Sequence, residues 1–203
     1  MRRTKEEAAL TRQNILKAAL NLFSEKGYAT TTLAEIAQHA EVTRGAIYWH
    51  FKGKADLFNS LASEISLRRD VVIQQAIAEG GTFTQIFHRI LTQLLRDIEE
   101  HPDVQAVMKL SLFKSASLPE LEESHALRLE ANRTMINNMA AFIQQGIEAG
   151  SVRPEIDPRD AARTALALHQ GLAMLWLYDP TAFSLAERAS ALADLYMQGI
   201  VAG

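Results

Sequence analysis

The stretch that decides the fold runs from residue 42 to residue 51 and reads Val42-Thr43-Arg44-Gly45-Ala46-Ile47-Tyr48-Trp49-His50-Phe51. Thr43 is of the residue type that caps a helix, so the pattern predicts a short helix directly after it. Ile47 and Phe51 lie four residues apart and are expected to face a core, which leaves Arg44 and Tyr48 on another face. A slim helix with donors on its outer face suits the major groove of DNA, which is about 12 Å wide.

The residues before this stretch predict two further helices. Thr32 and Glu35 form a capping-box pattern, which predicts a short helix over 33–40. Before it, apolar residues at helical spacing predict a longer helix that ends at Gly27, where a left-handed backbone is expected. Two short helices joined by a tight turn and preceded by a third form a tri-helical helix-turn-helix.

The rest of the chain is helical in pattern as well, and strand-like alternation is hard to find. Gly80-Gly81, His101-Pro102 and Asp157-Pro158 supply breaks between segments. The predicted helices lie near 54–78, 84–100, 103–114, 118–149, 158–178 and 184–201. The chain is therefore predicted to be all-α, with an N-terminal tri-helical helix-turn-helix domain at 1–55 and a C-terminal helical bundle at 56–203.

Charge is divided unevenly along the chain. Through Phe58 there are nine Lys or Arg residues and six Asp or Glu residues, a net charge of +3. The remaining residues carry a net charge of −6, so the chain as a whole carries −3. A basic head on an acidic body is typical of a small DNA-binding module attached to a second domain.

Composition excludes several other classes of protein. The chain has no cysteine, which rules out disulfides and thiolate metal sites and suits a reducing compartment. The longest uncharged stretch, 164–178, is shorter than the roughly 20 residues that a membrane span needs. No two histidines lie three or four residues apart, and phosphate-binding glycine patterns are absent. We expect a cytoplasmic protein that is not an enzyme, with no cofactor, no metal site and no membrane partner.

Residues 10–58 resemble the DNA-binding domain of the TetR family of repressors. The matching residues are Ile15, Ala18, Ala19, Phe23, Gly27, Tyr28, Thr31, Thr32, Ile36, Ala37, Val42, Gly45 to Phe51, Lys54, Leu57 and Phe58. The start, Arg2 to Ala8, and the run from Thr43 to Phe51 look like the AcrR branch, whose members control multidrug efflux. The rest of the chain matches the family in length and helical layout only.

The resemblance implies double-stranded operator DNA as a partner, at a roughly palindromic site. The predicted DNA-binding residues are Arg2, Arg3, Thr31, Thr32, Thr43, Arg44, Gly45, Tyr48, Trp49, His50 and Lys54. Arg44 is expected to hydrogen-bond the edge of a guanine or to bind a phosphate. Tyr48, His50 and Lys54 are expected to contact phosphates. The competing interpretation is that Tyr48 and Trp49 are core aromatics, as Phe51 is expected to be.

One residue departs from the family pattern. Glu41 occupies a turn position that is commonly glycine in the family, because the backbone there tends toward positive φ. A glutamate in that geometry costs on the order of 1 kcal/mol and places a negative charge near DNA.

The resemblance also implies a homodimer formed through the last two large helices, and the sequence supports it independently. Apolar residues step by three and four along both helices, as in a packed four-helix interface. The predicted interface residues are Ala161, Ala165, Leu168, Leu172, Leu175, Leu185, Ala189, Leu192 and Tyr196. The alternative is that these stripes form only the core of one chain.

A small hydrophobic or aromatic inducer is the second implied partner. Methionine and aromatic side chains adapt to such ligands, and a few polar groups orient them. The predicted ligand-binding residues are His88, Met108, Leu112, Phe113, Met135, Asn138, Met139, Phe142, His169, Gln170 and Trp176. An apolar stripe at helical spacing is also typical of plain core, so that interpretation stays open.

The sequence therefore predicts a ligand-responsive transcriptional repressor, and the AcrR-like head implies a multidrug efflux operon as its target. Two alternatives remain. One is an architectural protein that uses its helical body as a docking surface, and the other is an activator of the same family.

Overall fold

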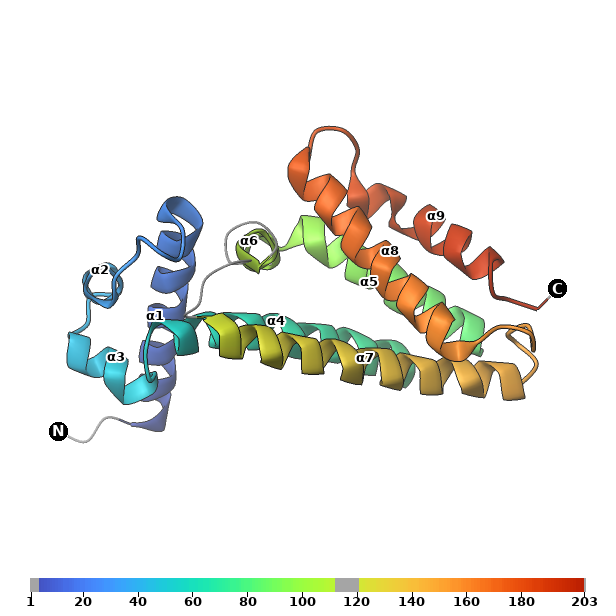
Figure 1. Ribbon diagram of the computed structural model, residues 1–203, viewed down its shortest axis with the longest axis horizontal. Coiled ribbons are helices and arrows are strands. Elements are labelled where there is room, and N and C mark those ends of the chain that lie inside the picture. The colour runs from blue at the N-terminus through green and yellow to red at the C-terminus, as the bar shows by residue number, and fades with distance from the viewer. Residues whose placement is uncertain (1–3, 112–120, 203) are drawn as a thin grey trace. The chain divides into compact units, whose positions relative to one another are not determined.

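The computed structural model describes residues 4–111 and 121–202, and within these ranges every regular element is a helix (Figure 1). The helices are Lys5–Lys26 (α1), Leu33–His39 (α2), Arg44–His50 (α3), Lys54–Ala78 (α4), Phe83–Glu100 (α5), Pro102–Lys109 (α6), Glu122–Glu148 (α7), Pro158–Tyr178 (α8) and Leu185–Gln198 (α9). The predicted all-α fold is confirmed. None of these helices is long and apolar enough to cross a membrane.

Local signals account for most of the helix boundaries. The capping box predicted at Thr32 is present, because its hydroxyl accepts from the Glu35 amide and the Glu35 carboxylate accepts from the Thr32 amide. Asp157 caps α8 with Pro158 in the first turn, as predicted. At α9, Ser184 accepts from the Glu187 amide. The predicted helix over 184–201 is shorter than expected, since α9 ends at Gln198.

The chain forms two compact units. Unit 1 contains residues 1–67 and 103–125, and unit 2 contains residues 68–102 and 126–203. The two units are groups of residues in mutual contact, and they are not shown to fold independently. The predicted domain boundary between residues 55 and 56 therefore stays a prediction.

The core of unit 1 joins α1, α2 and α3 to the first part of α4. Ile15, Ile36, Ile47 and Leu57 come from these four helices in turn, and all are fully buried. α1 packs against both short helices, and α2 packs against α3. The predicted tri-helical helix-turn-helix is therefore present, with its core supplied by the apolar positions that the helical spacing indicated.

The core of unit 2 is built around α5, which packs against α8 and α9. The rings of Phe83, Phe87 and Phe142 pack in tilted and edge-on arrangements with centroids 4.9–6.0 Å apart, and the Tyr196 ring meets that of Phe87 edge-on at 5.8 Å. The buried Tyr196 hydroxyl donates to the carbonyl of Ala161 at 2.7 Å. Burial raises the pKa of Tyr196, so the hydroxyl stays protonated and keeps α9 tied to α8.

Candidate nucleic-acid interface and effector site

The second short helix of unit 1, α3, is capped at its N-terminus and anchored along one face. The Thr43 hydroxyl accepts from the amide of Ala46 at 3.2 Å, which caps the helix. Ile47 and Phe51 are both buried, so they anchor the inner face of α3 against α1 and α2. The expectation that Phe51 is a core aromatic is confirmed.

The outer face of α3 carries two large aromatic side chains that the protomer does not bury. Tyr48 is 53% exposed and Trp49 is 73% exposed. The interpretation of these two residues as core aromatics is therefore wrong. Apolar rings exposed side by side on a seven-residue helix are unusual on a surface that meets only water, and they indicate an interaction site.

Polar residues surround the two rings. Thr43, Arg44 and Gly45 are exposed at the start of α3, and Arg44 forms no ion pair with any described residue. The Trp49 indole meets the His50 ring edge-on at a centroid distance of 4.5 Å. His50 is half-buried and thus supports the orientation of Trp49. The exposed surface of α3 therefore carries the guanidinium of Arg44, the phenol of Tyr48 and the indole of Trp49.

Lys54 has structural contacts that the sequence did not indicate. Its ammonium lies 4.4 Å from the centre of the Tyr28 ring and donates to the carbonyl of Ala29 at 3.3 Å. These contacts tie the start of α4 to the turn before α2. The predicted phosphate contact stays a prediction, and replacing Lys54 is expected to affect stability as well as DNA affinity.

The predicted role of Thr31 in DNA binding needs correction. Its side chain is 1% exposed, and its hydroxyl donates to the carbonyls of Gly27 and Leu22. A hydroxyl enclosed in this way has no surface to offer DNA, and it instead fixes the turn after α1. Gly27 in that turn has a positive φ of 87°, which favours glycine, but its ψ of 159° lies outside the left-handed helical region that was expected. Thr32 remains exposed at the cap of α2. Arg2 and Arg3 lie outside the described residues.

An ion pair between α1 and α2 makes the stability of the fold depend on pH. The ammonium of Lys26 lies 2.8 Å from the carboxylate of Glu35. The hydrogen bond from Lys26, together with those from Thr32, lowers the pKa of Glu35 to about 2. Because the folded pKa is depressed, the carboxylate stabilises the fold above its ordinary value near 4.5, and this contribution disappears as the pH falls toward 2.

We expect Glu35→Gln to flatten this acid response. Glutamine keeps the capping-box hydrogen bonds and removes only the charge. Between pH 4.5 and pH 2, the free energy of unfolding should fall less steeply in the variant than in the wild type. Urea unfolding followed by circular dichroism at several pH values measures this, and Lys26→Gln should have a similar effect. Parallel curves for the wild type and both variants would contradict the assignment.

The turn between α2 and α3 has the geometry expected at Glu41. Its φ is 54°, the one positive value at a non-glycine position among the described residues. A side chain in this left-handed region costs about 1–2 kcal/mol. Glycine removes this cost, although its greater freedom in the unfolded chain offsets part of the gain.

We therefore expect Glu41→Gly to raise the free energy of unfolding by about 0.5–1 kcal/mol. Glu41→Ala removes the charge and keeps the strained backbone, so it should not stabilise the protein. Thermal melts of the three proteins measure the difference. Equal stabilisation by alanine and glycine would show that the charge, and not φ, was the cause.

In unit 2, the predicted ligand-binding residues do not gather in one place. Met139 and Phe142 pack into the core, while Asn138 and Gln170 are exposed. Trp176 is buried, and its indole donates to the carbonyl of Phe183 at 3.2 Å. Met135 is half-buried on α7, Met108 belongs to unit 1, and Leu112 and Phe113 lie outside the described residues. The binding roles of the described residues stay predictions, and those of Asn138, Gln170 and Trp176 lose support.

His88 and His169 keep their place as candidates. His88 lies on α5, with its imidazole 3.1 Å from the carboxylate of Asp194 on α9. His169 is half-buried on α8 beside α5. Desolvation lowers the pKa of His169, although a hydrogen bond with the Leu94 backbone opposes this shift, and the charge of Arg69 lowers the pKa further. A neutral imidazole in this position is able to donate or accept a hydrogen bond.

An open groove of about 680 Å³ runs between α5 and α9. Its lining includes Thr84, His88, Arg89, Thr92, Arg96 and Met197. Sequence reasoning identified only His88 of these, although the other α5 members recur at helical spacing on one polar face. The Thr92 hydroxyl is buried with no hydrogen-bond partner among the described residues. A groove with apolar walls and several donors suits a small molecule that carries polar groups.

The predicted dimer residues divide into two sets. Ala161, Ala165, Leu185, Ala189 and Tyr196 are at most 7% exposed within one chain. They have almost no surface left for a partner, so the alternative of an intramolecular core holds for these five. The other predicted residues, Leu168, Leu172, Leu175 and Leu192, keep exposed surface.

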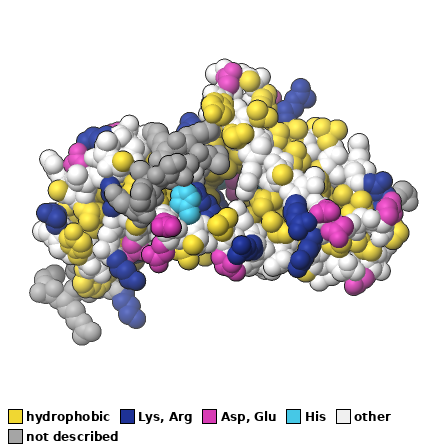
Figure 2. All heavy atoms as spheres, in the orientation of Figure 1, with side chains coloured by type: hydrophobic (Ala, Val, Ile, Leu, Met, Phe, Trp, Pro, Cys, Tyr) yellow, Lys and Arg dark blue, Asp and Glu magenta, His cyan; other side chains and the backbone are white. Residues whose placement is uncertain are grey.

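The exposed part of α8 and α9 forms a second apolar surface. Leu172, Leu175, Leu192 and Leu195 line a shallow groove of about 390 Å³ between these helices, and Leu175 and Leu195 are 60% and 68% exposed. Figure 2 shows hydrophobic side chains on the visible surface of α8 and α9. Leu195 follows Leu192 at helical spacing and widens the apolar stripe of α9, although it is not among the nine predicted interface residues. We call these four leucines the α8–α9 patch.

Comparisons with known proteins cover most of the chain. Residues 15–61 match the family described as "Bacterial regulatory proteins, tetR family", and residues 83–201 match the "MAATS-type transcriptional repressor, C-terminal region". The chain is 33% identical over 190 residues to the HTH-type transcriptional regulator AcrR of Shigella flexneri, covering 93% of this chain and 88% of the relative. It is 30% identical to the HTH-type transcriptional regulator TtgR of Pseudomonas putida, covering 91% and 89%.

A similar solved structure is that of NalD, the secondary repressor of the MexAB-OprM multidrug efflux pump in Pseudomonas aeruginosa. It superposes with a TM-score of 0.83 at 28% identity, covering 97% of this chain and 98% of NalD.

Proposed function

This chain belongs to the TetR family of bacterial regulatory proteins, and from that premise we propose that it is a homodimeric repressor whose operator affinity falls when a small hydrophobic or aromatic ligand binds. The observation that carries the proposal is the exposed pair Tyr48 and Trp49 on a helix that is capped and anchored on its other face. We place DNA recognition in residues 1–55 and ligand binding with dimerisation in residues 56–203. The protein acts in the cytoplasm, where operator DNA lies, and regulates without catalysis.

In the proposed complex, α3 enters the major groove. Arg44 has no ion pair with a described residue and is available to a guanine edge or a phosphate. Tyr48 contacts the phosphate backbone, and Trp49, supported by His50, offers an apolar surface to bases or sugars. Thr43 and the backbone at Gly45 lie at the end of the helix that approaches most closely.

Dimerisation uses the α8–α9 patch. One exposed and one half-buried leucine on each helix provide an apolar surface that a second copy covers with the same residues under two-fold symmetry. The symmetric dimer presents two α3 helices, so the operator has two half-sites about one helical turn or slightly more apart, with one turn being roughly 34–36 Å.

The regulated genes encode an efflux pump. This part of the proposal rests on relatives over most of the chain, since NalD is described as a repressor of a multidrug efflux pump. The ligand is then a compound that such a pump exports, and the groove between α5 and α9, at about 680 Å³, lies in the range of about 300–1,000 Å³ that suits small molecules. His88 lines this groove, whereas His169 on α8 does not and stays a separate candidate for ligand binding.

Ligand and DNA are coupled through the equilibrium between two conformations. A ligand that prefers the conformation with lower DNA affinity weakens operator binding, and DNA weakens ligand binding by the same factor. A coupling of about 1–3 kcal/mol, or roughly 5- to 150-fold, is ordinary.

A reporter assay tests repression and release together. The reporter promoter carries the DNA site that the purified chain selects, and a panel of hydrophobic drugs, dyes and plant phenolics is added. We expect low expression with the protein and higher expression with some compounds. Expression that rises with the protein alone would instead support an activator, and no sequence-specific binding would support an architectural protein.

Gly45 supplies a sharper test of close approach by DNA. It lies inside a helix with an ordinary φ, and an added Cβ would meet only the Thr43 hydroxyl at 3.8 Å. Gly45→Ala should therefore raise the free energy of unfolding by up to about 1 kcal/mol while it weakens operator binding. Thermal melts and DNA titrations measure the two effects. Higher stability with unchanged affinity would show that DNA does not approach this position.

A further inference from the structure

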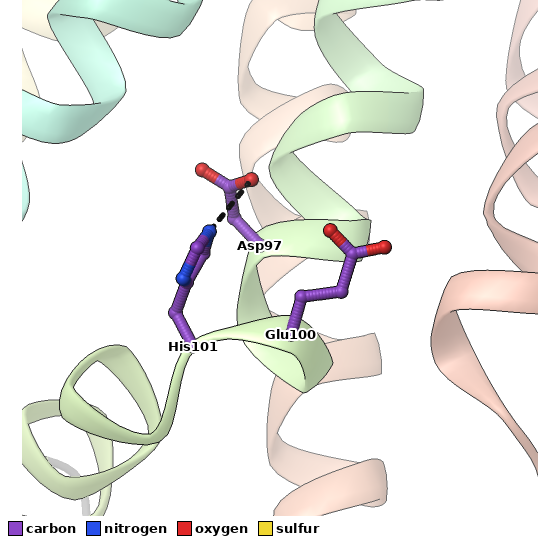
Figure 3. Close-up of side chains that lie close together, drawn as sticks. All are labelled: Asp97, Glu100 and His101. Carbon is purple, nitrogen blue, oxygen red and sulfur yellow. Dashed lines mark ion pairs between the residues drawn. The ribbon is translucent and has the colours of Figure 1, made fainter.

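Three side chains with metal-ligating atoms meet at the carboxyl end of α5 (Figure 3). Asp97, Glu100 and His101 each present one such atom, and the three atoms lie within 4.8 Å of one another. The backbone amide of His101 donates to the carbonyl of Asp97 at 3.2 Å, which turns the imidazole back toward the Asp97 carboxylate. The group belongs entirely to unit 2, and α5 ends at Glu100.

Asp97 is a buried carboxylate whose charge is poorly compensated. It is 7% exposed, and one oxygen, Oδ1, accepts from the Gln93 amide at 2.9 Å. Among the described residues, no Lys or Arg pairs with Asp97, and the ionisable group beside it is the imidazole of His101. Buried carboxylates are normally paired with a cation or coordinate a metal ion, so a bound cation would complement Asp97.

The spacing of the ligand atoms suits an ion placed between them. Asp97 Oδ1 and His101 Nε2 are 3.8 Å apart, which is too long for a hydrogen bond. Two ligands that each lie about 2.0–2.2 Å from one metal ion are separated by roughly 3–4 Å. Glu100 is exposed, so its side chain is free to close the remaining distance. Asp97 and His101 also line an open groove of about 320 Å³, together with Arg68 and Arg89, so the group is accessible from solvent.

We propose that Asp97, Glu100 and His101 bind one divalent first-row transition-metal ion, with water completing its coordination. Two carboxylates and a neutral imidazole balance the charge of a divalent ion, and the carbonyl end of the α5 dipole favours a cation at this place. The imidazole selects ions such as Zn²⁺ over Mg²⁺ and Ca²⁺, which prefer oxygen ligands. The side-chain amide of Gln93 donates to Asp97 Oδ1 and thereby orients the buried carboxylate.

Calorimetric titration of the full-length, chelator-treated and untagged protein with Zn²⁺ tests the proposal. We expect one Zn²⁺ per chain, with affinity reduced about tenfold or more in His101→Gln and in Glu100→Gln. Glu100 is exposed, so its variant should fold normally, which circular dichroism checks. The matched control is His39→Gln, an exposed histidine at the end of α2, and it should bind as the wild type does.

Three results would overturn the site. They are no stoichiometric binding by the wild type, wild-type affinity in either ligand variant, and an equal loss in the His39→Gln control. None of these results depends on DNA binding, so they are distinct from a failure of the proposed repressor function.

Discussion

The double variant Tyr48→Ala/Trp49→Ala is expected to bind operator DNA about 100-fold more weakly than the wild type, since each such contact is worth roughly 1–3 kcal/mol. Both rings are more than half exposed, and the inner face of α3 is held by Ile47 and Phe51 instead. The free energy of unfolding should therefore change by no more than about 0.5 kcal/mol, as for other surface substitutions. Fluorescence anisotropy with a labelled operator measures the affinity.

Leu10→Ala is the matched control for this experiment. Leu10 is 59% exposed on α1, so its replacement removes exposed apolar surface from the same unit outside α3. It should leave operator affinity unchanged. A double variant that binds DNA as tightly as the wild type would exclude α3 as the recognition helix. An equal loss of affinity in Leu10→Ala would show that the loss is not specific to α3.

Leu175→Glu is expected to shift the protein from dimer to monomer, raising the dimer dissociation constant by about 100-fold or more, because a charge would replace an apolar contact in the proposed interface. Leu175 is 60% exposed in one chain, so the glutamate is solvated in the monomer, which should fold normally. Operator affinity should fall as well, since one head contacts only one half-site. Sedimentation velocity measures the association state.

The control for the interface is Leu129→Glu. Leu129 is 59% exposed on α7, away from the α8–α9 patch, so the same change of residue type is made at the same exposure. It should leave the protein dimeric. If Leu175→Glu also stayed dimeric, the interface would lie outside the α8–α9 patch.

Local signals in the sequence were sufficient for the helices and for the recognition face. Thr32 with Glu35, Thr43, and Asp157 with Pro158 act within one helical turn, so their roles follow from spacing alone. These features depend little on the rest of the chain. The positive φ at Glu41 was instead expected from the family resemblance, in which this turn position is commonly glycine.

Features that depend on distant partners were not predictable. Thr31 was assigned to DNA because nothing local indicates that the carbonyl of Leu22, nine residues earlier, takes its hydroxyl. Periodicity identified the apolar faces of α8 and α9, but it does not say which chain covers them, and Ala165 and Ala189 proved to face the protomer's own core. A search for pairs of histidines at helical spacing does not find His101, because the residues near it with metal-ligating atoms are the carboxylates Asp97 and Glu100.

Selection of binding sites from random-sequence DNA by the purified wild-type protein tests the central claim most directly. The account predicts a recovered sequence with two-fold symmetry and half-sites about one helical turn or slightly more apart. The enriched site should be lost when Tyr48→Ala/Trp49→Ala is used in the selection. Recovery of no preferred sequence, or of a preferred sequence without two-fold symmetry, would contradict a dimeric repressor that reads DNA through α3.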